Sequence, residues 1–127
     1  MQDRPTATEL LDAIAEFLIR DVAPNVPNWL TFQVRVASNS LGIIKREIDL
    51  EASHMEEEWS SLGNLLGHRD ADNAGTRDAI RIANQELCER IRDGQFDTPM
   101  ERKKLLEHLH ATVRNKLAVS SPRALQQ

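Results

Sequence analysis

The segment WLTFQVRVASNSLGIIKREIDL, residues 29–50, decides the fold class of this 127-residue chain. Apolar residues recur in it at steps of four and three, the period of an α-helix with one buried side. We call these residues the seam: Leu30, Val34, Ala37, Leu41, Ile44 and Ile48. The pattern predicts that the seam faces the core of a helical bundle.

A second apolar row lies nearly opposite the seam, at about 100° per residue. We call it the outer row: Trp29, Phe32, Val36, Ile43 and Leu50. A helix that is apolar on two sides either sits centrally in its bundle or docks one side onto another chain. Because soluble monomers rarely expose large apolar patches, the outer row is a candidate interface with a protein partner or, in a homodimer, with a second copy.

Four further stretches have helical periodicity and start or stop signals. Thr6 and Glu9 form a capping-box pattern, and Pro24 and Pro27 end the helix that follows. Helices are also expected over about 53–66, 76–93 and 98–119. Short connections favour antiparallel neighbours. The sequence therefore predicts an all-α fold, an up-and-down bundle of about five helices, with residues 1–127 as one domain and a disordered tail at about 123–127.

The expected core stripes of the later helices follow from the same spacing. They are Met55, Trp59, Leu62 and Leu66, then Ile80, Ala83, Leu87 and Ile91, and last Leu105, Leu106, Leu109, Val113 and Leu117.

Composition excludes several classes of protein. The formal charge of −4 and the pI near 5.5 argue against a nucleic-acid partner. No apolar run approaches the length of a membrane span, so no membrane contact is expected. The lone cysteine, Cys88, has no internal disulfide partner, which fits the reducing cytoplasm. It lies beside Leu87 without a neighbouring histidine, so we expect a buried structural thiol.

A polar stripe of Arg35, Asn39 and Arg46 runs between the two apolar rows of residues 29–50. Asparagine has poor helix propensity, so an interaction must favour Asn39 in mid-helix. One interpretation is a hydrogen bond between helices that fixes their register. The other is a site for a small anion or carboxylate that the two arginines bind.

Two Glu-x-x-His pairs, Glu51–His54 and Glu107–His110, have the spacing of di-metal bundle ligands. Helical geometry places both pairs away from the expected core, so we expect no metal and no cofactor. The same reasoning puts His108 toward solvent and His110 beside the core stripe. The glycines are scattered and no catalytic residues can be assigned, so an enzyme is not expected.

The chain resembles a family of small, uncharacterised, all-helical bacterial proteins. The resemblance rests on Arg4-Pro5-Thr6, Glu9-Leu10-Leu11, Phe32, Arg35-Val36-Ala37, Asn39, Leu41, Asn84, Leu87, Cys88, Ile91, Gly94, Thr112-Val113, Leu117 and Pro122-Arg123. It implies genes encoded beside aminoglycoside-phosphotransferase-like kinases and acyl-CoA dehydrogenases. We therefore expect a non-enzymatic accessory or interaction protein, with a kinase-like or acyl-CoA dehydrogenase enzyme as its partner. The alternative is a small-molecule binder or weak enzyme with a site near Arg35, Asn39 and Arg46.

Overall fold

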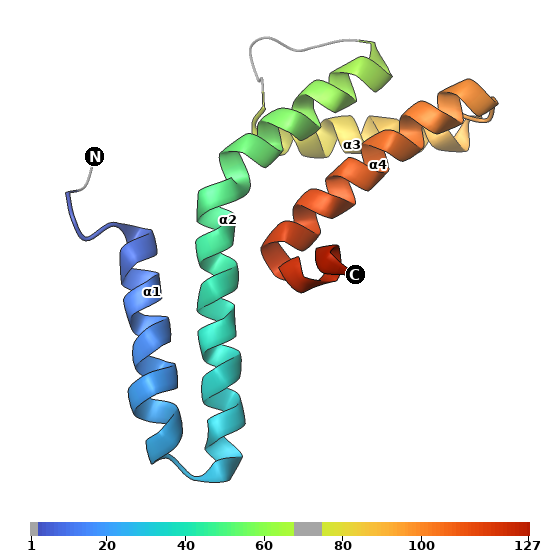
Figure 1. The fold of residues 1–127 in the computed structure, drawn as a ribbon. Helices are drawn as coiled ribbons and strands as arrows, with labels where there is room; N and C mark the ends of the chain where they lie inside the picture. The colour runs from blue at the N-terminus through green and yellow to red at the C-terminus, as the bar shows by residue number, and fades with distance from the viewer. Residues whose placement is uncertain (1–2, 68–74) are drawn as a thin grey trace. The chain divides into compact units, whose positions relative to one another are not determined.

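The computed structural model describes residues 3–67 and 75–127, and every regular element in that part of the chain is a helix. The α-helices are α1 (Ala7–Phe17), α2 (Asn28–Leu66), α3 (Arg77–Arg92) and α4 (Pro99–Ser120) (Figure 1). A π-helix, η1 (Leu18–Val22), and a 3-10 helix, η2 (Ala23–Asn25), follow α1. A last 3-10 helix, η3 (Pro122–Gln126), occupies the region where a disordered tail was expected. The all-α prediction is confirmed.

The five expected helices become four because residues 29–50 and 53–66 lie in one helix. α2 has 39 residues and continues through Ala52 and Ser53. Ser53 resembles a helix start, but no proline or glycine stands near it to end the preceding helix. None of the described helices is apolar over a length that would cross a membrane.

Backbone contacts divide the chain into two compact units, Met1–Glu51 and Ala52–Gln127. The first unit is a helical hairpin in which α1 runs antiparallel to the first part of α2 (Figure 1). Polar contacts join its helices. Ser38 Oγ donates to the Ala15 carbonyl oxygen at 3.2 Å, and Lys45 Nζ lies 2.9 Å from Asp12 Oδ2. The hydrogen bond to Asp12 and its negative charge raise the pKa of the Lys45 ammonium.

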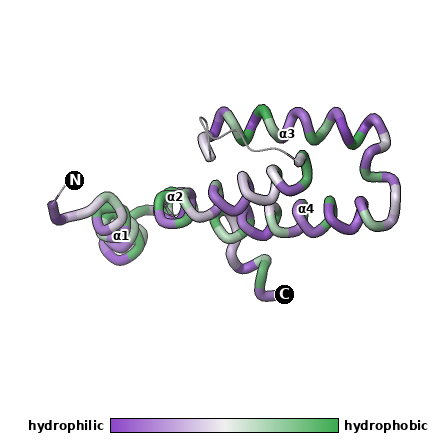
Figure 2. The backbone as a smooth tube through the Cα atoms, turned by 90° about the horizontal axis from the view of Figure 1, so that it is seen from above, coloured by the Kyte–Doolittle hydropathy of each residue, from purple (hydrophilic) through white to green (hydrophobic). Residues whose placement is uncertain are grey.

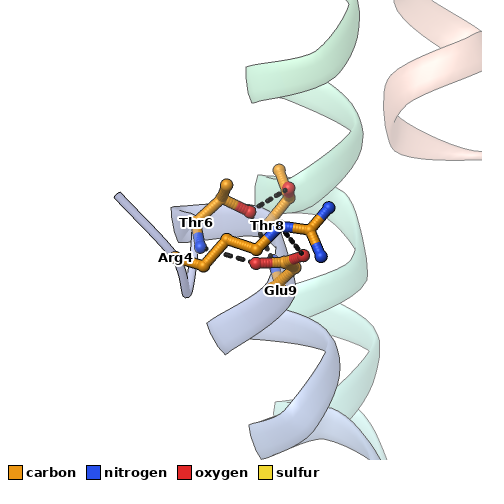
Figure 3. Close-up of polar contacts among 4 residues, drawn as sticks. All are labelled: Arg4, Thr6, Thr8 and Glu9. Atoms are coloured by element: carbon orange, nitrogen blue, oxygen red, sulfur yellow. Dashed lines mark hydrogen bonds and ion pairs between the residues drawn. The ribbon is translucent and has the colours of Figure 1, made fainter. Parts of the chain in front are cut away.

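The capping box predicted at the start of α1 is confirmed (Figure 3). The Thr6 N–H donates to Glu9 Oε2 at 2.8 Å, and the Glu9 N–H donates to Thr6 Oγ1 at 3.2 Å. Arg4 adds an exposed ion pair to the same carboxylate, with Nε 3.7 Å from Oε1. These bonds satisfy backbone donors that a helix start leaves unpaired, so α1 begins where the sequence places it.

The seam is only partly buried, which corrects the expectation that all of it faces a core. Val34 is buried, and Leu30 and Leu41 are half-buried. Ala37, Ile44 and Ile48 are exposed. The reason is that α1 covers only the arc of α2 around Val34, Ser38 and Lys45, and one neighbouring helix cannot cover a wider stripe.

The second unit combines the end of α2 with α3 and α4. Its core contains Leu62, Leu66, Ile80, Ala83, Leu87, Phe96 and Leu105, with Met55, Trp59 and Leu65 packed against them. Figure 2 shows α3 and α4 running in opposite directions through a short connection. Gly94 begins that connection with φ +84°, the left-handed conformation that ends many helices. Phe96, two residues later, is buried and was missed by the sequence pattern because it lies outside any helix.

The stripe expected on α4 is wrong in part. Leu105 is buried, but Leu106, Leu109 and Val113 are 44%, 38% and 54% exposed. On α3, Ile80, Ala83 and Leu87 are buried as predicted, whereas Ile91 is 37% exposed.

Candidate functional site

A groove of about 610 Å³ lies at the turn of the hairpin, entirely within the first unit. One wall is apolar and comes from η1, η2 and the residues after them: Ile19, Ala23, Pro24 and Val26. The other wall is polar and comes from α2: Asn28, Thr31, Arg35 and Asn39. The groove has the size of a small-molecule site and combines apolar surface with a few polar groups.

Local hydrogen bonds fix the shape of this turn. Asn25 Nδ2 donates to the Asp21 carbonyl oxygen at 2.8 Å, which closes the last turn after α1. Thr31 Oγ1 donates to the Ala23 carbonyl oxygen at 3.3 Å and ties the start of α2 to η2. Pro24 and Pro27 lack backbone N–H groups and have restricted φ angles, so the chain between the helices is stiff. These bonds and the two prolines therefore hold the apolar wall in place.

Two members of the predicted polar stripe line the groove. Arg35 and Asn39 are one helical turn apart, so their side chains leave α2 on the same side. Both are exposed, and neither has a hydrogen bond or ion pair within the described residues. The register-fixing bond considered for Asn39 is therefore absent from the described part of the chain.

The third member, Arg46, does not line the groove. Its Nη1 atom lies 3.3 Å from the position that a Cβ would occupy at Gly42, so the guanidinium lies over that glycine. Arg46 has an interaction partner of its own. Two of the three residues predicted from the sequence therefore line the groove. The sequence could not separate them from Arg46, because all three share one side of α2.

The outer row contains the most exposed large apolar side chains of the hairpin. Trp29 is 71%, Phe32 72% and Val36 46% exposed, and Ile43 and Leu50 are half-buried. Because the row points away from α1, the hairpin itself leaves it uncovered.

A second exposed apolar surface, the hairpin face, was not singled out from the sequence. It consists of Leu10, Ile14 and Phe17 of α1 with Ile44 and Ile48 of α2, each between 45% and 55% exposed. At about 100° per residue, both sets lie on the same side of the plane through the two helices. Arg35 and Asn39 lie on the other side of that plane.

His108 is buried, which corrects its expected place in solvent. Its Nδ1 atom lies 2.6 Å from Ser61 Oγ, so α4 and the end of α2 share a partly buried polar pair. Burial lowers the pKa of His108, and the negative charge of Glu58 opposes this effect. Thr112 Oγ1 donates to the His108 carbonyl oxygen at 3.0 Å. The sequence signal was the spacing of Leu105, His108 and Thr112, one residue away from the more apolar stripe.

A hollow of about 270 Å³ borders this pair, with Asn64, Lys104 and Glu107 around it. A serine hydroxyl beside a neutral imidazole resembles part of a nucleophilic site. Ser61 lies inside the last turns of α2, however, where the backbone N–H groups are used by the helix. We therefore interpret the pair as a structural contact between helices.

The remaining sequence candidates do not assemble. Within residues 3–67 and 75–127, no three His, Cys, Asp or Glu side chains lie close enough together to hold a metal ion. His54 is half-buried and His110 is exposed, so His110 does not flank the core as expected. Cys88 is exposed, which corrects its expected burial, because α3 turns Leu87 inward and the next residue outward.

Comparison with known proteins gives one result. No curated protein and no solved structure matches the chain. The model of a family described as a domain of unknown function, DUF6285, matches residues 24–124. This region contains all of α2, α3 and α4 and begins after α1, and it agrees with the resemblance to an uncharacterised family. Since the match spans most of its length, the chain belongs to the DUF6285 family.

Proposed function

We propose that the protein is a non-enzymatic interaction module that forms a homodimer through the apolar surface of its hairpin. The observation that carries this proposal is that α1 has no buried residue. An isolated helix of 11 residues is marginal in water, and most helices in proteins are held by packing of an apolar face. α1 has such a face, and the hairpin leaves Leu10, Ile14 and Phe17 open.

The amount of exposed apolar surface supports a specific interface. The hairpin face and the outer row together contain eight large side chains that are 45% to 72% exposed. Soluble monomers rarely expose apolar patches above a few hundred Å².

A second copy of the chain is the occupant that fits the geometry best. Two helical hairpins packed face to face form a four-helix bundle, the arrangement in which helices of this kind bury their apolar stripes. Two-fold symmetry lets the same patch of two identical chains meet itself, so one apolar face is enough to form the interface.

The test is sedimentation velocity on the whole chain over a range of concentrations. Ile14→Asp changes the hairpin face, and Phe32→Asp changes the outer row. Met100→Asp is the control, at a residue of α4 that is as exposed as Phe32. We expect a dimer for the wild type and for Met100→Asp, and a folded monomer for at least one hairpin variant. A wild type that stays monomeric at tens of micromolar contradicts the homodimer, and so does a dimer that survives both hairpin substitutions.

The family resemblance adds a finer proposal about the setting. The protein acts in the bacterial cytoplasm, and its dimer serves a kinase-like or acyl-CoA dehydrogenase enzyme encoded beside it. Co-expression with that enzyme and co-purification through a tag on either protein test this step. Retention of the enzyme by the wild type, and its loss with the hairpin variants, supports the accessory role. Equal retention by the Ile14→Asp and Phe32→Asp variants contradicts a role for this surface.

A further inference from the structure

We propose that the groove at the hairpin turn binds a small carboxylate with a short apolar body, and that Arg35 holds its carboxylate. The groove lies within one unit and shares no residue with the surface proposed for dimerisation. Its lining contains one cation and no acidic residue, in a chain whose formal charge is −4. A local excess of positive charge in an acidic protein favours an anionic ligand at this place.

Arg35 is the centre of the proposed site because its guanidinium has no partner within the described residues. A guanidinium presents two parallel N–H groups that match the two oxygens of a carboxylate. Asn39 follows one turn later, and its side-chain amide can donate to the same anion. Asn28 lies further along the same wall, so the polar donors form one row on α2.

The opposite wall indicates what the rest of the ligand is like. Ile19, Ala23, Pro24 and Val26 offer apolar surface without a charged group. An inorganic anion would leave this wall in contact with water, whereas a hydrocarbon body would cover it. A volume of about 610 Å³ leaves room for such a body beside the carboxylate.

The charge of the groove selects a monoanion over a phosphate dianion. A site for a phosphate dianion commonly adds further cations to balance the second negative charge. Here one guanidinium balances one negative charge, and Arg46 lies over Gly42, outside the groove. The ligand that matches both walls is therefore an amphipathic monocarboxylate.

The experiment is a titration of the isotope-labelled whole chain with hexanoate, followed by NMR. We expect saturating shifts that are confined to the Arg35 and Asn39 side chains and to backbone amides around Ala23 and Val26. Hexanol tests whether the charge is needed, and inorganic phosphate tests whether any anion suffices. Arg35→Gln removes the cation, and Arg114→Gln is a control at an exposed arginine outside the groove.

We expect Arg35→Gln to weaken hexanoate binding about tenfold, as loss of a charge-assisted hydrogen bond does, and Arg114→Gln to leave it unchanged. Hexanoate that produces no saturating shift in the groove overturns the proposal. Equal binding by hexanol, tighter binding by phosphate, or unchanged binding by Arg35→Gln also overturns it. Far-ultraviolet circular dichroism of each variant verifies the fold, and the Asn39→Leu variant provides a second route if Arg35→Gln does not fold.

Discussion

The two units of the chain solve the problem of burying apolar surface differently. The unit from Ala52 to Gln127 places three helical segments around Leu62, which has no exposed surface, and six other buried residues join it in the core. The hairpin has two helices, buries Ala23 and Val34, and leaves whole rows of apolar side chains open. Three helices can enclose a space, whereas two can only touch along a line. The difference is that the second unit encloses a core of its own, whereas the hairpin does not.

The largest expected effect separates the two units directly. Leu62→Ala leaves a cavity in a packed core, so it should lower the free energy of unfolding by about 3 kcal/mol. Ile14→Ala changes an exposed residue and should cost less than about 1 kcal/mol in dilute solution. Its cost should rise with protein concentration as the dimer forms. Urea denaturation at a low and a high protein concentration measures the cost of both substitutions. If the cost of Ile14→Ala does not depend on protein concentration, the proposed difference between the two units is wrong.

A pair of glycines gives the next contrast. Gly94 has φ +84°, and an added Cβ would lie 2.9 Å from Asp97 Oδ2. Gly94→Ala should therefore cost about 1–2 kcal/mol. Gly42 lies inside α2, where alanine is the better helix former, and the nearest atom is the movable end of Arg46. Thermal unfolding should show a lower midpoint for the first variant and an equal or higher one for Gly42→Ala; two equal losses would contradict this reading.

Acid should affect the second unit through His108. Burial lowers the pKa of this imidazole in the folded state, whereas in the unfolded chain it returns to about 6.5. Above that pH the ring is neutral in both states and the histidine makes no pH-dependent contribution. As the pH falls below it, the unfolded chain takes up the proton first, so stability is lost until the folded pKa is passed.

The measurement is the urea midpoint between about pH 7.5 and pH 5.5, across the histidine range. His108→Gln should flatten the loss of stability in this window, and His110→Gln, at an exposed residue of the same helix, should leave it unchanged. A wild type whose stability does not fall over this range would show that His108 is not buried as described.

The smallest expected effect concerns the hairpin. Lys45 and Asp12 form an ion pair that water and salt can reach, so Lys45→Gln should lower the denaturation midpoint slightly at low salt and not at high salt. Lys103→Gln, at an exposed residue of α4, is the matched control. If Lys45→Gln lowers the denaturation midpoint at high salt as well, the Lys45 side chain stabilises the hairpin through packing and not through its charge.

The same comparison explains what the sequence could predict. Local signals located the helix starts, because Thr6, Thr76 and Thr98 each accept a hydrogen bond from a backbone N–H three residues on. Periodicity found the core where three helices meet, at Leu62, Ile80 and Leu87. It overestimated burial at Ile44 and Ile48, because spacing shows which residues share a side and not whether another helix covers it.

The candidate site was half predictable for the same reason. Arg35 and Asn39 were found from their shared side of α2. The apolar wall was not found, because Ile19, Pro24 and Val26 come from a π-helix, a 3-10 helix and the link after them, where the α-helical period does not apply. The sequence placed His108 wrongly because its burial depends on a hydrogen bond to Ser61, which is 47 residues away in sequence. Local spacing carries no information about such a distant partner.

The exposure of Cys88 has a practical consequence. The chain has one cysteine, and α3 presents it at the surface. A single thiol-reactive spin label or fluorophore can therefore be attached to the natural sequence without any substitution. In an assembly of two chains, the two labels form one distance pair, which pulsed electron resonance or energy transfer reads without ambiguity of site. A label on Cys88 therefore allows the number of associated chains and the distance between them to be measured on the natural sequence.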